Sequence, residues 1–174
     1  LKKLPEQVIV VLDEAYDTFI DVDDYPDSLN LIKTGRNVIA LKTFSKAYGL
    51  AGLRVGTSVS SKCLAGYMER VRQPFNVNLI AQAAARAALS DDQFLNKLRK
   101  LNLKGKHFLY SQLKSLKIPY VESVANFVLI DCKRDCVEIF KKMLKMGVIV
   151  RDMKQYNLNT FIRVTIGTED ENAR

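Results

Sequence analysis

The sequence predicts an α/β fold, with part of a large, mixed, mostly parallel sheet domain followed by a small C-terminal α+β domain. The first reason is that two apolar runs rich in β-branched residues, 8–12 and 38–42, are typical of strands buried on both faces. The second is that a helix-forming stretch joins these runs into an α/β unit. The third is that strand and helix patterns alternate again beyond a long helical connection. We therefore expect one domain at residues 1–84 and another at residues 85–174.

The elements of the first domain follow from the apolar runs and the turn residues between them. The first strand ends at Asp13, and the acidic stretch after it contains Pro26 and is expected to be a loop. The expected elements, in order, are strands at 8–12 and 38–42 with a helix at 28–33 between them, a strand at 55–60, and helices at 61–71 and 79–89. Residues 73–78 contain a proline and should separate the last two helices.

A long helix that runs to about Leu116 should open the second domain. Ser90 and Gln93 have the spacing of a capping box at its start. Apolar residues and one glycine recur along it at three- and four-residue steps, which predicts a packed face: Leu98, Leu101, Gly105, Leu109, Leu113 and Leu116. Gly105 on that face indicates close packing rather than a helix break, and His107, which lies off it, should face solvent.

Shorter elements are expected after the long helix. Strands are expected at 120–121, 127–130, 148–150 and 161–166, with a helix near 134–146 that Gly147 ends. Thr168 and Glu171 form a second capping box, which announces a helix. Only three residues follow this box, so we expect the C-terminus to be artificial or cleaved within the last helix.

The composition is that of a globular protein, with 48% hydrophobic and 26% charged residues. No apolar stretch approaches the about 18 residues of a membrane-spanning helix, and the first five residues are too short and polar for a signal peptide. The net charge is +8, but the basic residues are dispersed. Their densest group is expected to be a solvated helix face: Lys97, Arg99, Lys100, Lys104 and Lys106. We expect neither a nucleic-acid nor a membrane partner, and a cytoplasmic location.

Cysteine and acidic residues give little support for a metal site. Cys63, Cys132 and Cys136 form no CxxC pair, and with one histidine in the chain they are best interpreted as reduced packing residues. An acidic cluster that begins at Asp21 would form a calcium loop only with glycine at its sixth position, where Pro26 stands. No metal is therefore expected.

Residues that can carry chemistry follow the ends of the two predicted parallel strands. Asp13 ends the first strand and Ser45-Lys46 follows the second, at the edge where open α/β sheets bind ligands. A lysine in a partly buried pocket can act as a nucleophilic amine, whose characteristic partner is an aldehyde. Pyridoxal phosphate is such an aldehyde, and it needs a lysine, a carboxylate at its pyridine nitrogen and a phosphate cradle. The sequence offers these groups in Lys46, in Asp13, and in Thr43, Ser45 and Arg54, while Tyr16 could hydrogen-bond the phenolic oxygen.

Three blocks resemble the fold-type I pyridoxal-phosphate aminotransferases of the aspartate aminotransferase superfamily: Asp13-Glu14-Ala15-Tyr16, Thr43-Phe44-Ser45-Lys46 and Gly52-Leu53-Arg54-Val55-Gly56. Further blocks are similar to the histidinol-phosphate aminotransferase family: TFSKAYGLAGLRVG, RQPFNVN, PYVESVANFVLID, GVIVRDM and FIRVTIGTEDEN. The resemblance runs from Val8 to Asn172 and implies a fragment of the pyridoxal-phosphate-dependent transferase fold. Aromatic amino-acid aminotransferases and threonine-phosphate decarboxylases share the lysine motif and stay open as alternatives.

The resemblance implies roles for particular residues. Lys46 would form the Schiff base with the cofactor and move the proton, and Asp13 would pair with the pyridine nitrogen. Tyr16 would contact the phenolic oxygen, and Ser45 and Arg54, with Thr43 a weaker candidate, would hold the phosphate. For the substrate, the resemblance implies Arg163 at an acidic group, Arg151 near the phosphate, and Asn126 close to the site.

The implied function is transfer of the amino group between histidinol phosphate and 2-oxoglutarate, with glutamate as the amino form of the latter. The resemblance also implies a role in histidine biosynthesis and a cytoplasmic, homodimeric protein. The family's fold also needs an N-terminal half that this chain does not contain, including a phosphate-binding helix start and an aromatic residue that stacks on the cofactor. We therefore expect the chain alone to be inactive, with sheet edges and apolar faces exposed. A hypothesis of another class is a non-catalytic basic binding module that keeps an aminotransferase-like fold.

Overall fold

The computed structural model describes residues 3–174 and contains two compact units. Unit 1 comprises the described residues up to Thr18 together with Val22–Leu95, and unit 2 comprises Phe19–Asp21 and Asn96–Arg174. The contacts therefore divide the chain after Leu95, whereas the sequence placed the domain boundary after residue 84. Residues beyond 84 belong to unit 1 in part because Ala85 is buried in the core of that unit and Ala88 packs against it. The predicted domains, 1–84 and 85–174, stay a prediction. The first two residues lie outside the described range.

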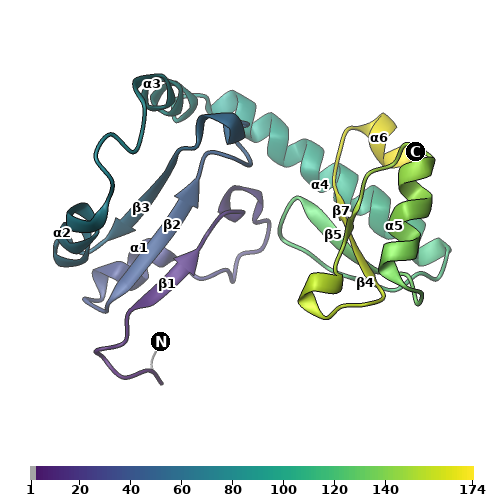
Figure 1. Cartoon of the computed structure of the whole chain (residues 1–174), viewed down its shortest axis with the longest axis horizontal. Coiled ribbons are helices and arrows are strands. Elements are labelled where there is room, and N and C mark those ends of the chain that lie inside the picture. Colours follow the sequence, from purple (N-terminus) through teal and green to yellow (C-terminus); the bar gives the residue numbers. More distant parts are fainter. Residues whose placement is uncertain (1–2) are drawn as a thin grey trace. The chain divides into compact units, whose positions relative to one another are not determined.

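Unit 1 is built on a three-stranded mixed sheet of order β1-β2-β3 (Figure 1). Strand β1 (Val10–Asp13) pairs in parallel with β2 (Val38–Thr43), and β2 pairs antiparallel with β3 (Gly56–Ser60). Helix α1 (Ser28–Lys33) connects the parallel pair, and the side chain of Asp27 caps its first amides. The predicted α/β unit is confirmed, with its helix at the predicted residues.

The parallel strands are not buried on both faces, contrary to the prediction from the apolar runs but in agreement with the expectation of exposed sheet edges and apolar faces. Val38 and Ala40 on β2 are fully buried, but Val11 on β1 is 54% exposed and its neighbour Ile9 is also exposed. The reason is that β1 pairs with β2 alone among the described residues, so alternate side chains and one edge of β1 remain open. An apolar run can thus mark a strand without showing how many of its faces are covered.

The rest of unit 1 consists of two helices and short 3-10 turns. Helix α2 (Lys62–Val71) starts at the cap Ser61, and α3 (Leu79–Ala88) starts at the cap Asn78. The irregular stretch between them is the predicted break. The 3-10 turns are η1 (Asp17–Phe19) and η2 (Ala51–Leu53). The core of this unit joins the loop after β2 to α3 through four buried residues: Phe44, Val55, Ala81 and Ala85. Cys63 is exposed, so it is not the packing residue that was predicted.

Unit 2 is an antiparallel sheet of order β4-β5-β7-β6 with helices that share its core (Figure 1). The strands are β4 (Tyr120–Val121), β5 (Phe127–Asp131), β6 (Arg151–Asp152) and β7 (Phe161–Thr165). The helices are α4 (Asp92–Ser115), α5 (Cys136–Lys145) and α6 (Glu169–Ala173), with a 3-10 turn η3 (Lys154–Tyr156). Val128 and Ile162 from the sheet pack with Leu113 of α4 and Cys136 of α5. The predicted α+β pattern is confirmed.

Two local predictions in the second half were wrong. Residues 148–150 are not a strand, because the Val148 amide bonds to the Met143 carbonyl and closes the end of α5, where Gly147 has a φ of 77°. Helix α4 is capped by Asp91, not Ser90, because the Asp91 carboxylate accepts the Phe94 amide at 2.9 Å. At the C-terminus the Thr168–Glu171 capping box is present and α6 follows it, so the start signal does lead to a helix.

Helix α4 follows its predicted stripe in the middle and departs from it elsewhere. A Cβ atom at Gly105 would lie 2.6 Å from Ile166 Cγ2, which confirms close packing there, and His107 is exposed as predicted. Leu116 is 66% exposed because the helix ends before it. Lys106, assigned from sequence to a solvated basic face, is only 3% exposed.

Candidate functional site

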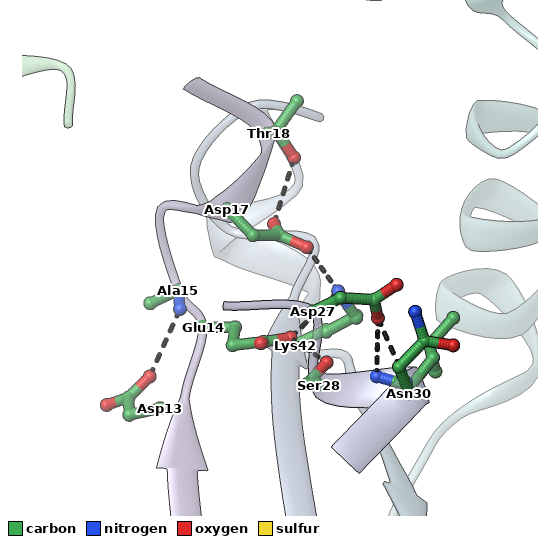
Figure 2. Close-up of polar contacts among 10 residues, drawn as sticks. Asp13, Glu14, Ala15, Asp17, Thr18, Asp27, Ser28, Asn30 and Lys42 are labelled. Carbon is green, nitrogen blue, oxygen red and sulfur yellow. Dashed lines mark hydrogen bonds and ion pairs between the residues drawn. The ribbon is translucent and has the colours of Figure 1, made fainter. Parts of the chain in front are cut away.

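The carboxyl edge of the β1–β2 pair presents Asp13. Pairing between the strands continues one residue beyond β1, where the Glu14 amide donates to the Leu41 carbonyl at 2.9 Å. The Asp13 side chain is exposed and accepts the Ala15 amide at 3.2 Å. Successive strand side chains point to opposite faces, so Asp13 and Glu14 face different surroundings (Figure 2). Asp13 is therefore a carboxylate with a fixed backbone that is open to a ligand.

Lys46 lies on a compact turn after β2. The Thr43 hydroxyl accepts the Ser45 amide at 3.1 Å, and the Leu50 amide bonds back to the Phe44 carbonyl at 2.9 Å. Phe44 and Ala47 are buried and anchor the turn, which leaves Lys46 between them and exposed. The described residues do not enclose this lysine in the partly buried pocket that its predicted chemistry requires.

Lys46 and Tyr16 are brought together from the ends of the two parallel strands. The Lys46 Nζ atom lies 5.7 Å from the centre of the Tyr16 ring. This is within the range of a cation–π contact. The predicted amine and the predicted phenol thus lie side by side, on the turns that follow β2 and β1.

Arg54 occupies a strained backbone position directly after η2. Its φ of 53° and ψ of 51° are left-handed, which is uncommon for a residue with a side chain. Its Nη1 atom donates to the Ala51 carbonyl at 2.9 Å, and the side chain is exposed. Two residues later the chain passes so close to β2 that a Cβ atom at Gly56 would lie 2.8 Å from the Lys42 carbonyl oxygen. The arginine and this glycine define a tight, ordered path into β3.

A network of charged residues behind Asp13 was not predicted from the sequence. Lys42 Nζ pairs with Glu14 Oε2 at 2.9 Å and with Asp17, and the Ser28 hydroxyl donates to Glu14 at 3.0 Å (Figure 2). Glu14 is buried, with 6% of its surface exposed. Burial lowers the pKa of Lys42, but the hydrogen bonds and charges of Asp17 and Glu14 together raise it above 10.5. Lys42 therefore stays charged.

The two predicted substrate arginines face each other in unit 2. Arg151 on β6 is the register partner of Arg163 on β7. The Arg163 guanidinium lies 4.9 Å from the centre of the Phe127 ring, and its Nε atom is buried with no hydrogen-bond partner among the described residues. Both arginines line a cavity of about 460 Å³. Its other lining residues are Phe140, Ile149, Val150, Asp152, Gln155 and Thr165. Like charges placed opposite each other destabilise a sheet, and an anion between the two guanidinium groups would relieve this repulsion.

Asn126 lies one residue before Phe127, the ring on which Arg163 stacks. It is half-buried, and its carbonyl accepts the Ile166 amide at 2.9 Å. The loop that leads to it is held by α4, because Lys106 Nζ donates to the Ser123 carbonyl at 2.9 Å and pairs with Asp21 at 2.7 Å. Lys106 is thus a buried, paired cation rather than a solvated one.

Tyr110 completes the support of this loop. Its hydroxyl accepts the Ser123 amide at 2.7 Å. Burial raises the pKa of Tyr110 and outweighs the hydrogen bond with Ser123, which lowers it, so this hydroxyl remains protonated at neutral pH. The loop before Asn126 is therefore held at Ser123, whose carbonyl accepts from Lys106 and whose amide donates to Tyr110.

Within residues 3–174, no three His, Cys, Asp or Glu side chains gather as a metal site would require. None of the helices over the same range has the length and apolar character needed to cross a bilayer.

Comparisons with known proteins place these features in a wider group. The family model described as aminotransferase class I and II matches residues 1–174. A histidinol-phosphate aminotransferase from Moorella thermoacetica is 51% identical over 99% of this chain and 45% of its own length. Another, from Caldicellulosiruptor saccharolyticus, is 44% identical over 99% of this chain and 48% of its own length.

A solved structure shows the same similarity in three dimensions. The histidinol-phosphate aminotransferase from Sinorhizobium meliloti, determined in complex with pyridoxal-5'-phosphate, superposes with a TM-score of 0.88 and 32% identity. The match covers 99% of this chain and 48% of that chain. This chain therefore spans about half the length of the relatives that it matches. The predicted fold class, a fragment of this α/β transferase fold, is confirmed.

Proposed function

This chain belongs to the aminotransferase class I and II family, and on that premise we propose that it forms the C-terminal half of a pyridoxal-phosphate-dependent histidinol-phosphate aminotransferase. The observation that carries the proposal is the placement of Lys46 beside the Tyr16 ring, at the ends of the parallel strands that also present Asp13. The names of the similar proteins from Moorella and Caldicellulosiruptor support the choice of substrate.

The residues present fit pyridoxal phosphate. Asp13 offers an exposed carboxylate, Tyr16 and Lys46 are neighbours, and Arg54 presents an exposed guanidinium from a fixed backbone. When bound, the cofactor supplies an aldehyde and a ring that accepts electrons. Lys46 would hold the aldehyde carbon and carry the proton to and from the substrate Cα. Asp13 would keep the pyridine nitrogen of the cofactor protonated, because a nearby carboxylate favours the positively charged form of that nitrogen.

The remaining cofactor contacts are assigned by chemistry. The Tyr16 hydroxyl would hydrogen-bond the phenolic oxygen. Arg54 and the Ser45 hydroxyl would bind the phosphate, with Thr43 as a weaker partner, since guanidinium forms paired bonds with phosphate oxygens. The Thr43 hydroxyl already accepts the Ser45 amide, which orders the turn that carries Lys46.

The arginine pair of unit 2 is proposed as the substrate anchor. The Nε–H group of Arg163, which has no partner among the described residues, would donate a hydrogen bond to a carboxylate or phosphate oxygen. Histidinol phosphate, glutamate and 2-oxoglutarate all carry such a group, and Arg151 opposite would add a second positive charge. Asn126 would reach the same substrate from the loop before β5.

The whole protein is proposed to act in histidine biosynthesis in the cytoplasm, as a homodimer. Because Lys46 is exposed in this chain, we propose that the chain alone is inactive and that the rest of the protein encloses the amine. The non-catalytic alternative, a basic binding module, has less support, because Lys106 of the helical basic group is buried and paired with Asp21.

The proposal is tested on the full-length protein. Pyridoxal phosphate is added, the covalent bond is reduced with borohydride, and the labelled residue is mapped by mass spectrometry. The label should lie on Lys46, should vanish in Lys46→Ala and should remain in the control Lys104→Met. A label elsewhere, or none in the wild type, contradicts the catalytic hypothesis. Transamination of histidinol phosphate, compared with that of aromatic amino acids, then tests the substrate.

A further inference from the structure

We propose that Lys42 is a positioning residue, which holds the Asp13–Tyr16 segment against β2 through its ion pairs with Glu14 and Asp17. This inference rests on the proposed function, because it assigns Lys42 the task of fixing two cofactor-binding residues relative to Lys46. Lys42 itself touches neither the cofactor nor the substrate in this proposal.

The ion pairs bracket the segment that carries the two cofactor-binding residues. Glu14 directly follows Asp13, and Asp17 directly follows Tyr16. Lys42 Nζ lies 2.9 Å from Glu14 and also bonds to Asp17, so one ammonium group holds both ends of the turn (Figure 2). The backbone ladder stops at the Glu14 amide, and beyond it the ion pair with Asp17 ties the turn to β2.

The network connects four elements of unit 1. Lys42 belongs to β2, and Glu14 directly follows β1. Asp17 belongs to η1, and Ser28 lies in the first turn of α1, where its hydroxyl donates to Glu14 at 3.0 Å. Lys42 also lies four residues before Lys46 on the same segment. A displacement of the Asp13–Tyr16 turn relative to β2 would therefore change the spacing between the two strand ends that form the proposed site.

A network of this kind is better explained by geometry than by stability. A buried ion pair contributes little net stability, because desolvation offsets the attraction, but it does restrict the arrangement of the groups that it joins. Lys42 and Asp17 are about one-third exposed, which weakens their attraction further, whereas Glu14 is buried and has both Lys42 and Ser28 as partners. Glu14 keeps both partners in only one arrangement of the turn at residues 13–17, so these contacts fix the position of that turn.

The two lysines of this segment thus have separate tasks. Lys42 is engaged by two carboxylates and is not available to a ligand, whereas Lys46 is exposed beside Tyr16. An amine fixed by two carboxylates stays protonated and is a poor nucleophile. Loss of Lys42 should therefore weaken cofactor binding, although the cofactor is bound covalently by Lys46 and not by Lys42.

The experiment uses the full-length protein with Lys42→Met, which removes the charge, and Lys42→Arg, which keeps it. Lys104→Met removes an exposed ion pair with Glu169 in unit 2 and serves as the charge control. Val38→Ala weakens the buried start of β2 without touching the network and serves as the stability control. Hydrogen exchange of the peptide 13–19 is measured without cofactor, and the dissociation constant of pyridoxal phosphate is measured by absorbance titration.

Lys42→Met should speed exchange in the peptide 13–19 and raise the cofactor dissociation constant about 10- to 100-fold, as small displacements of binding groups do. Lys42→Arg should restore both quantities most of the way, and both controls should leave them near the wild-type values. In turnover, Lys42→Met with added cofactor should lower kcat more than it changes KM for the amino donor. Asp17→Asn, which keeps the Lys42–Glu14 pair, replaces Lys42→Met if that variant does not fold, and it should show the same changes more weakly.

Two outcomes overturn the positioning role. One is unchanged exchange and cofactor affinity in Lys42→Met or, where that variant does not fold, in Asp17→Asn. The other is an equal loss of cofactor affinity in Val38→Ala at the same loss of thermal stability, since the effect would then be general. Failure of the wild type to bind pyridoxal phosphate at Lys46 overturns the proposed function instead, and the exchange comparison still decides whether Lys42 holds the turn.

Discussion

At the scale of single residues, Arg54 shows how function and backbone geometry can oppose each other. Left-handed backbone favours glycine, yet this position carries an arginine with an exposed side chain, whose guanidinium donates to the Ala51 carbonyl in the same turn. Such positions persist where the side chain has a task. The strain is thus consistent with the proposed phosphate contact.

Replacing Arg54 should separate the backbone effect from the side-chain effect. Arg54→Gly and Arg54→Ala both remove the guanidinium, so both should weaken pyridoxal phosphate binding about 10- to 100-fold. Arg54→Gly should nevertheless be more stable than Arg54→Ala by about 1 kcal/mol, because only glycine adopts the left-handed backbone without strain. Urea unfolding and cofactor titration measure the two quantities. Equal stabilities of the two variants would show that the backbone at this position is not strained.

Asp131 should make stability depend on pH in a narrow acidic range. The hydrogen bonds from Lys133, side chain and backbone, and from Thr160 lower the pKa of Asp131 from 3.8 to about 2. The unfolded chain therefore binds the proton more readily, so the stabilisation is complete above about pH 4 and is lost as the pH falls towards 2. Between pH 4 and 2, the urea midpoint of Asp131→Asn should change less with pH than the midpoint of the wild type. Parallel profiles for the two proteins would refute this.

The sequence predicted where the proposed cofactor-binding residues lie, but gave no sign of the groups that support them. Asp13 and Lys46 could be found because each follows an apolar run, and parallel strands end at one edge. The Lys42 network could not be found, because its pairs depend on the path of the turn at 14–17 rather than on spacing. Lys106 was misjudged for the same reason, since its partner Asp21 lies 85 positions away, as the residue numbers show.

At the scale of elements, local signals decided most boundaries. Helix α1 and strand β4 lie at the predicted residues, and the capping box of α6 is present. Errors arose where two signals competed, as at Val148, whose apolar character suggested a strand while its amide closes α5. Burial could not be predicted from a strand's own composition, because it depends on what covers each face.

Two helix glycines should respond oppositely to alanine. At Gly105 in α4, a Cβ atom would lie 2.6 Å from Ile166 Cγ2 and 2.7 Å from Asn172 Nδ2, and Asn172 is held by two bonds to Gly167. Overpacking costs about 1–3 kcal/mol, which exceeds the roughly 1 kcal/mol gained in helix propensity, so Gly105→Ala should destabilise.

Gly66 in α2 is the matched control for Gly105. A Cβ atom at this position would have open space around it, because outside its own helix backbone no atom of the described residues lies within 4 Å. Gly66→Ala should therefore stabilise by up to about 1 kcal/mol. Urea unfolding of both variants gives the comparison. A stabilising Gly105→Ala would mean that α4 and the residues around Ile166 are less closely packed than the structure shows.

At the scale of the whole molecule, the chain passes between its two units more often than a simple boundary would require. Residues up to Thr18 belong to unit 1, Phe19–Asp21 to unit 2, and the chain returns to unit 1 at Val22. Sequence patterns gave no sign of this, because the stretch looks like an acidic loop. Phe19 is buried and Asp21 pairs with Lys106, so this short segment is an integral part of unit 2.

Lys106 should hold this segment in unit 2. Lys106→Met leaves Asp21 without its ammonium partner and the Ser123 carbonyl without a donor. Asp21 keeps some contact with water, so the expected loss is about 1–3 kcal/mol, below that of a fully buried pair. Lys104→Met, which breaks an ion pair whose side chains are 69% and 73% exposed, should change stability by less than about 1 kcal/mol. Urea unfolding measures both variants. Hydrogen exchange of residues 19–25 should rise only in Lys106→Met, and equal exchange in the two variants would show that Phe19–Asp21 stays in unit 2 without this ion pair.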